Sequence, residues 1–511
     1  MSAVWAVLAA YLAVLLVLGV WGSRESGTMS GYFVADKKLP SWVVAFSNNA
    51  TGESGWLLLG LTGMGYAVGA HAFWVILGEV AGVAAAWVFV ARPFKEYTDR
   101  YDAITVPDYL EARFRDTAHV LRWVGVVVIS TMVLAYVAAQ LTASGKAFDS
   151  FLGTGYTGGV LLGAAVVFFY TSVGGFKAVA YSDVLQGVLM LGCLVAIPVV
   201  AFLAAGGWTE VMSALAAEDP ALLRPMGAFG LTARGVASAV GFAAIGLAFL
   251  GSPQLLTRFM SARDGKQLRD GSLIAVLCII GFDVGAVFAG MAGRVLFPGL
   301  ADPETILPAL AGSLLPPVLA GLVMVVVLAA IMSTVDSLLI LASSAVVRDV
   351  IQKTLRPDIA ERRLALWGRL TTVVLGVGAL VLALGEVRMI FWFVLFAWSG
   401  IACAFTPVVL LSLFWPRTTR AGAVAGMAGG FLVTVGWVVW LKAGVWDLYE
   451  MIPGMAVGLL LTWGVSLVTE PPEGAHEEVA SVRAVVGTAF RAPEGEARPA
   501  APREPERAPV A

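Results

Sequence analysis

Two segments of the sequence carry groups that could bind a small cation, and both lie inside long apolar stretches. The first is residues 51–56 (Thr-Gly-Glu-Ser-Gly-Trp), which place a carboxyl group, two hydroxyls and two glycines within the apolar stretch 41–69. Non-helical backbone at that depth survives only where it is buried in protein or lines a cavity. A helix broken in mid-membrane is typical of a transport site. The alternative is a kink whose backbone groups are paired by neighbouring helices.

The second segment, residues 329–337 (Ala-Ala-Ile-Met-Ser-Thr-Val-Asp-Ser), lies in the ninth apolar stretch. Positions three and four apart share one face of a helix, so residues 330, 333 and 334 point the same way. A hard cation without its water prefers oxygen ligands. Carbonyls freed by the break and the hydroxyls of this turn therefore predict a neutral Na⁺ site formed by Ala50, Glu53, Ala330, Ser333 and Thr334. Alternatively, the two hydroxyls bond back to their own helical turn.

Acidic residues also occur within the apolar stretches: Glu53, Glu79, Asp183, Asp283 and Asp336. A charge at that depth is costly unless it is paired, hydrated or protonated, so each is a candidate functional residue. Asp183, Asp336 and Ser337 are predicted to form a possible second cation site, because they lie close in depth to the first. Alternatively, either aspartate is a protonated carboxyl or a structural hydrogen-bond acceptor. Glu79 and Asp283 are interpreted as structural or water-facing groups.

The composition places these segments in a membrane protein. The chain is 59% hydrophobic and 13% charged with a mean hydropathy of +0.85, whereas soluble domains have about 25% charged residues. The net charge of −2 gives no indication of a nucleic-acid partner. A span needs about 20 apolar residues. The predicted spans are residues 3–22, 41–69, 71–91, 119–147, 157–174, 178–206, 231–251, 271–297, 316–347, 364–384, 388–414, 421–441 and 451–469.

Lys and Arg gather in alternate loops between these spans, beginning with the first loop. This pattern predicts an external N-terminus and a cytoplasmic C-terminus. The first span has no basic leader or cleavage site, so we expect a retained helix rather than a signal peptide. The three cysteines occur singly in separate spans and predict neither a disulfide nor a metal site.

Residues 1–470 are predicted to form one membrane domain. Residues 471–511 are rich in Pro, Ala, Glu and Arg and are predicted to be a disordered cytoplasmic tail. The second span breaks at 50–55 and the seventh near Gly246, Gly251 and Pro253. The two spans are five places apart in order, an odd number, so the two broken helices cross in opposite directions, as in an inverted repeat with a midplane site. The alternative is Gly-Pro kinks without a repeat.

At these motifs the sequence resembles the solute:sodium symporter family, and within it the bacterial sodium/proline symporters. The resemblance covers nearly all of residues 1–470. Its motifs are residues 54–58 (Ser-Gly-Trp-Leu-Leu), 105–109 (Thr-Val-Pro-Asp-Tyr), 182–186 (Ser-Asp-Val-Leu-Gln), Pro253 with 258–260 (Arg-Phe-Met), 329–334, 406–410 (Thr-Pro-Val-Val-Leu), 421–427 and 448–454.

The resemblance implies an all-α polytopic membrane protein of about thirteen transmembrane helices, with a LeuT-like 5+5 inverted repeat. It implies Na⁺-coupled uptake of a small amino acid, above all L-proline, across the bacterial cell (inner) membrane, with Na⁺ as the co-transported ion. The family's main sodium site falls on the five residues derived above, and its second site on Asp183, Asp336 and Ser337. The substrate pocket falls on Ser54, Gly55, Trp56, Tyr136, Phe249 and Pro253.

Three positions depart from the proline-symporter pattern. Gly52 stands where those proteins have Asp, Ile245 where they have Trp, and Phe249 where they have Tyr. The alternatives are therefore a sodium symporter for another amino acid, an osmolyte or a monocarboxylate, and a membrane sensor or channel of the same fold. An enzyme is not expected, because the sequence shows no nucleophile–base pair or cluster of metal ligands.

Overall fold

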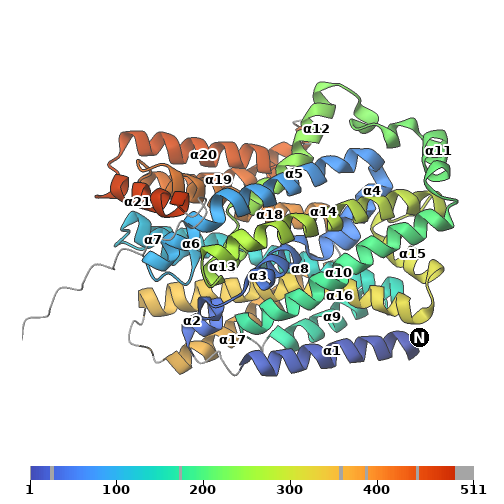
Figure 1. The fold of residues 1–511 in the computed structure, drawn as a ribbon, viewed down its shortest axis with the longest axis horizontal. Helices are drawn as coiled ribbons and strands as arrows, with labels where there is room; N and C mark the ends of the chain where they lie inside the picture. Colours follow the sequence, from blue (N-terminus) through green and yellow to red (C-terminus); the bar gives the residue numbers. More distant parts are fainter. Residues whose placement is uncertain are drawn as a thin grey trace, which may run out of the picture.

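The computed structural model describes residues 2–23, 28–171, 175–355, 359, 361–385, 390–444 and 448–488. Within them, most long helices lie side by side along one direction (Figure 1). No β-strand occurs in these ranges, only an isolated bridge between Leu39 and Ala262. The α-helices are α1 (Ser2–Ser23), α2 (Met29–Val34), α3 (Ser41–Gly55), α4 (Thr62–Val68), α5 (Phe73–Ala85), α6 (Ala91–Arg100), α7 (Val106–Phe114), α8 (Val120–Leu152), α9 (Tyr156–Thr171), α10 (Phe176–Ala204), α11 (Trp208–Glu218), α12 (Ala233–Ala244), α13 (Pro253–Ser261), α14 (Gly265–Leu296), α15 (Ile306–Leu314), α16 (Pro317–Ser344), α17 (Glu361–Ala383), α18 (Ile390–Phe414), α19 (Arg420–Gly436), α20 (Met451–Val468) and α21 (Ala475–Thr488).

The described helices account for the predicted number of spans. Eleven helical segments are long and apolar enough to cross a membrane, and one of them, Ser41–Arg100, has 60 residues. A straight helix of that length would measure about 90 Å, roughly three bilayer cores. Instead the chain turns back at Gly69–Ala72, between α4 and α5 (Figure 1). Counting this segment as two crossings and adding the shorter apolar helix α9 gives thirteen.

Both predicted helix breaks are present. α3 is interrupted at Ser54, whose φ of 57° and ψ of −173° are not helical, and the chain continues through a π-helical segment, Trp56–Leu61, into α4. A non-glycine residue held at positive φ costs about 1–3 kcal/mol and is characteristic of functional sites. α12 passes into a 3-10 segment, Ile245–Leu250, that ends before α13 begins at Pro253. Proline suits the first turn of a helix, because a backbone N–H at that position has no acceptor within the helix.

Glycines bring the helices around these breaks into close contact. A Cβ atom on Gly246 would lie 1.8 Å from the carbonyl oxygen of Gly78 on α5, and one on Gly290 of α14 would lie 2.1 Å from that of Thr62. Such small residues let membrane helices approach backbone to backbone. α5 and α14 are thereby packed against the two broken helices and can place side chains beside the breaks.

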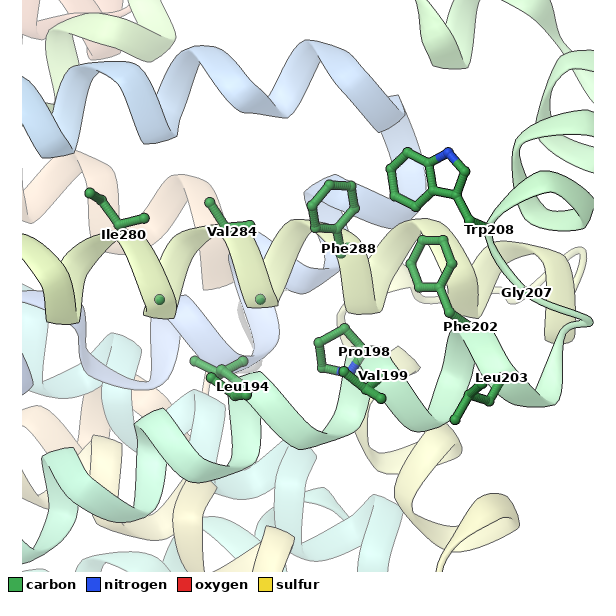
Figure 2. Close-up of a pocket in the computed structure, with 13 residues that line it drawn as sticks. Leu194, Pro198, Val199, Phe202, Leu203, Gly207, Trp208, Ile280, Val284 and Phe288 are labelled. Atoms are coloured by element: carbon green, nitrogen blue, oxygen red, sulfur yellow. The ribbon is translucent and has the colours of Figure 1, made fainter.

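An apolar groove of about 470 Å³ runs between α10 and α14 on the outside of this bundle (Figure 2). Phe202, Trp208 and Phe288 surround one end of it (Figure 2). Val199 and Leu203 on its edge are 55% and 73% exposed. Such exposure of aliphatic side chains is expected where a helix faces lipid chains. The groove therefore belongs to the lipid-facing surface rather than to a site for a polar solute.

The predicted disorder of the tail is wrong for its first part, because Ala475–Thr488 form α21. This helix packs on α6, where Glu478 accepts a hydrogen bond from Tyr101 and lies 3.5 Å from Arg113. Burial and that hydrogen bond raise the pKa of the Tyr101 phenol, so it stays protonated as the donor. The disorder prediction missed these partners because they come from a distant loop. Residues 489–511 lie outside the described residues.

Candidate cation and solute site

The broken helix α3 meets α16 through buried oxygen atoms. The hydroxyl oxygen of Ser333 lies 2.9 Å from the carbonyl oxygen of Ala50 and 2.9 Å from that of Ala330. The hydroxyl of Thr334 donates to the carbonyl of Thr51 at 3.1 Å. Ligands held about 2.4 Å from a shared ion sit about 3.4 Å apart at right angles. If the distances between these oxygens increased by a few tenths of an ångström, the oxygens could surround a Na⁺-sized cation.

Four of the five residues predicted for the sodium site come together here, and the fifth differs. The carbonyl of Glu53 accepts a hydrogen bond from the Trp56 amide, so in this conformation it closes the turn at the break. The carbonyl of Thr51 takes part instead, which the sequence did not predict. It is free because the amide of Gly55, its partner in a regular helix, donates to the side chain of Gln140 at 3.0 Å.

The residues of the possible second cation site surround a guanidinium group. Arg258 on α13 ion-pairs with Asp183 at 3.1 Å and also donates to Ser337 and, at 2.7 Å, to Thr51. Asp183 and Arg258 are fully buried, as is Asp336 nearby on α16. In this conformation, the positive charge beside these residues is that of Arg258, where a second cation was predicted from the sequence.

Predicted substrate residues near the two breaks make contacts with aromatic rings of α18. Trp56 stacks on Phe391 with ring centroids 5.4 Å apart. Trp398 contacts Phe249 edge-on at 5.4 Å and Tyr136 at 6.3 Å. Three of the predicted substrate residues thus lie in two aromatic groups, each of which includes one α18 residue that the sequence did not predict.

Trp398 bears on one departure from the proline-symporter pattern. Its indole N–H donates to the carbonyl oxygen of Ile245 at 3.1 Å. Position 245 lacks the indole of the proline-symporter pattern, but the indole of Trp398 on α18 lies beside the backbone of this same residue. Only packing between distant segments reveals this, because residues 245 and 398 are far apart in the sequence.

Several buried polar groups around the two breaks have no hydrogen-bond partner among the described protein atoms. They include the indole nitrogen of Trp56, the amide nitrogen of Gln140 and the hydroxyls of Ser252 and Thr406. Ser252 directly precedes Pro253, the first residue of α13. Unpaired buried donors are costly, so their presence near the break suits a pocket that a polar solute completes. Ser54 and Gly55 form the start of the second half of the broken helix.

The other two departures are coupled by contact. A Cβ atom on Gly52 would lie 2.8 Å from the Phe249 ring, closer than two carbon atoms normally approach. We expect Gly52→Asp alone to destabilise the protein and abolish transport, since the added carboxyl would be buried against an aromatic edge. Changing Phe249→Ala in the same chain should restore folding. Thermal unfolding in detergent of the two single variants and the double variant measures this coupling; additive effects would contradict it.

A bundle of broken helices in an inverted repeat, with freed backbone oxygens facing hydroxyls at mid-depth, defines a membrane transporter of the LeuT-like fold. This chain belongs to the sodium:solute symporter family, whose model matches residues 32–430.

Two relatives match this chain over most of their own length. The chain is 35% identical over 467 residues to the high-affinity proline transporter PutP of Bacillus subtilis, covering 90% of this chain and 97% of that protein. It is 32% identical over 482 residues to a sodium/proline symporter of Staphylococcus aureus, covering 91% and 92%.

Solved structures confirm the fold. A Na⁺-coupled sialic acid symporter in a substrate-bound outward-open state matches with a TM-score of 0.77 at 20% identity, covering 92% of this chain and 98% of that one. Mhp1, a nucleobase-cation-symport-1 family transporter, matches with a TM-score of 0.57 at 12% identity and 88% and 98% coverage. MhsT matches with a TM-score of 0.52 at 16% identity and 84% and 97% coverage.

Proposed function

We propose that this protein takes up L-proline together with Na⁺, and that Na⁺ binds between α3 and α16. The observation that carries the proposal is the contact of the Ala50 and Thr51 carbonyls with the hydroxyls of Ser333 and Thr334. The ligand set would comprise these groups, the carbonyl of Ala330 and, after rearrangement of the turn, that of Glu53. The names of the two relatives support proline as the solute.

The proposed solute site uses the second half of the broken helix. Its first amides and its positive dipole end near Ser54 and Gly55 suit a carboxylate, which would replace the Gln140 side chain as the acceptor for the Gly55 amide. Trp56, Tyr136 and Phe249 would pack on the pyrrolidine ring of proline. Pro253, at the start of α13, would complete the pocket. Ion and solute need no direct contact, since coupling requires only that both favour one conformation.

The proposed membrane arrangement follows from the charge pattern. Residues 1–470 form the transport domain in the bacterial inner membrane, with the N-terminus outside and the C-terminus in the cytoplasm. Na⁺ entry is then driven by a membrane potential worth about 2.3 kcal/mol per charge per 100 mV. This corresponds to more than tenfold accumulation of solute, since about 1.4 kcal/mol is a factor of ten.

Uptake of labelled proline into proteoliposomes tests the proposal. We expect uptake to rise at least tenfold when an inward Na⁺ gradient replaces an equal K⁺ gradient. Equal uptake under both gradients would contradict sodium coupling. Binding of proline without net flux would point to a sensor, and flux that never runs against a proline gradient would point to a channel.

A different small solute is the second candidate, favoured by the altered contact between Gly52 and Phe249. A phenylalanine ring in place of tyrosine removes a hydroxyl from the pocket, and loss of one such group changes recognition strongly. Competition of labelled proline uptake by other amino acids, osmolytes and monocarboxylates separates the candidates. A competitor that inhibits at lower concentration than unlabelled proline would identify the preferred solute.

A further inference from the structure

Three carboxyl groups from three helices meet beside the break in α3. They belong to Glu53, to Glu79 on α5 and to Asp283 on α14. One oxygen atom from each lies within 4.8 Å of the others. The side chains are 0%, 3% and 0% exposed, so the interpretation of Glu79 and Asp283 as water-facing is wrong.

The packing of the helices explains why these groups converge. Asp283, Val287 and Gly290 follow one another at spacings of four and three on α14, so they share a face. Backbone atoms of Val287 lie where a side chain on Gly65 would be, and Gly290 meets Thr62. This face of α14 is thus pressed against the helix that follows the break, and Asp283 extends it toward Glu53.

The cluster contains oxygen atoms that point to a missing ligand. Both carboxyl oxygens of Glu53, both of Asp283 and Oε2 of Glu79 are buried and receive no hydrogen bond from a donor group elsewhere in the described residues, and the carboxyls of Glu79 and Asp283 lie within hydrogen-bonding reach of each other. None of the ion pairs found in the described part of the chain involves these three residues. Carboxylates buried in a membrane interior are costly unless they are paired, hydrated or protonated. A cation bound among the three carboxylates would offset part of their negative charge.

We propose that Glu53, Glu79 and Asp283 form a binding site for a hard metal cation of Na⁺ or Ca²⁺ size. A point equidistant from three oxygens 4.8 Å apart lies 4.8/√3, or about 2.8 Å, from each, and less for a tighter triangle. The bond length of a Ca²⁺-sized ion is about 2.3–2.6 Å, whereas Mg²⁺ requires about 2.0–2.1 Å. Carboxylate oxygens are the ligands that such hard cations prefer.

This site is distinct from the one between α3 and α16. It takes side chains from α5 and α14, neither of which contributes an oxygen to the first site, and a different group of Glu53, its carboxylate rather than its carbonyl. An ion here would join the broken helix to α5 and α14. If the proposed function holds, two ions would therefore act on the same break from different helices.

Equilibrium binding of ²²Na⁺ and ⁴⁵Ca²⁺ to the purified full chain in lipid nanodiscs, without proline, tests the site. The variant Glu79→Gln/Asp283→Asn replaces two carboxylates by neutral amides, which are weaker ligands, and changes no residue of α3. We expect it to bind one of the two ions at least about tenfold more weakly, comparable to the loss caused by disturbing a metal site. Weaker binding of ²²Na⁺ would identify Na⁺ as the occupant of the site. Weaker binding of ⁴⁵Ca²⁺ alone would identify Ca²⁺.

Three controls make the test decisive. Glu450→Gln changes a buried carboxylate that pairs with Lys442 at 3.0 Å and does not belong to the cluster, and this variant should bind both ions normally. Ser333→Ala/Thr334→Ala should retain the ion held by the carboxylates. Because Glu79→Gln/Asp283→Asn could misfold, Glu79→Asp, which keeps all three carboxylates, should retain measurable binding of the same ion.

Two outcomes would overturn the proposal. One is binding of both metals by Glu79→Gln/Asp283→Asn with the affinities of the unmodified protein. The other is a change confined to proton release on acid–base titration with unchanged metal binding, which would make the cluster a proton site. The absence of proline from the assay separates this result from the proposed function, which would fail in the uptake experiment instead.

Discussion

Replacing Ser333 and Thr334 together by alanine is expected to raise the Na⁺ concentration for half-maximal uptake by about a hundredfold or more. Each hydroxyl would contribute a hydrogen-bond-strength contact to a charged group, worth about 1.5–3 kcal/mol. Two such losses amount to at least about 3 kcal/mol, and each 1.4 kcal/mol is a factor of ten. Initial rates of labelled proline uptake at increasing Na⁺, at constant membrane potential, measure the shift.

Ser343→Ala is a matched control for this experiment. Ser343 lies on the same helix, is equally buried, and donates to the carbonyl of Gly368 on α17 at 2.9 Å, far from the break. Its removal should leave the Na⁺ dependence unchanged. A Ser333→Ala/Thr334→Ala protein that folds and keeps the ordinary Na⁺ dependence would rule out the proposed sodium site.

The positions of the breaks could be predicted from local sequence, because backbone preferences are local. Glycine and polar residues interrupt the apolar stretch at 51–55, and proline marks the start of α13. The thirteen spans could be predicted for the same reason, since a run of about 20 consecutive apolar residues indicates each of them. The oxygen chemistry of the two segments predicted the pairing of α3 with α16, and the family resemblance implied the same pairing.

The remaining parts of the site depend on contacts between distant segments. The carbonyl of Thr51 becomes available only because Gln140 on α8 takes the amide of Gly55. From α18, Trp398 contacts Phe249 and Phe391 contacts Trp56. None of these residues carries a local signal that separates it from an ordinary membrane-helix residue.

The acidic residues show the same division between local and tertiary information. Charge at mid-membrane depth was enough to select all five as candidates. It could not sort Glu53, Glu79 and Asp283 into one cluster and Asp183 into an ion pair with Arg258. That sorting requires the close approach of α5 and α14 to the broken helix, which the glycine contacts provide.

Arg258→Gln is expected to destabilise the protein by about 3–5 kcal/mol, because it leaves the carboxylate of Asp183 buried without its partner. The loss also removes the donor that joins α13 to Thr51 and Ser337. Thermal unfolding in detergent should show a clearly lower midpoint, whereas Arg294→Gln, which breaks a partly exposed pair with Glu218, should change stability by no more than about 1 kcal/mol. An unchanged midpoint for Arg258→Gln would contradict the structural role of the pair.

Adding Asp183→Asn to the Arg258→Gln chain should recover much of that stability, since the carboxylate that ion-pairs with Arg258 is then also removed. The single variant also tests the second cation site predicted from Asp183, Asp336 and Ser337. With the guanidinium gone, these oxygens would be open to an ion, and Na⁺ should then raise the unfolding midpoint of Arg258→Gln more than that of the unmodified protein. Equal effects of Na⁺ on both would mean that Arg258 is the only cation this cluster accommodates.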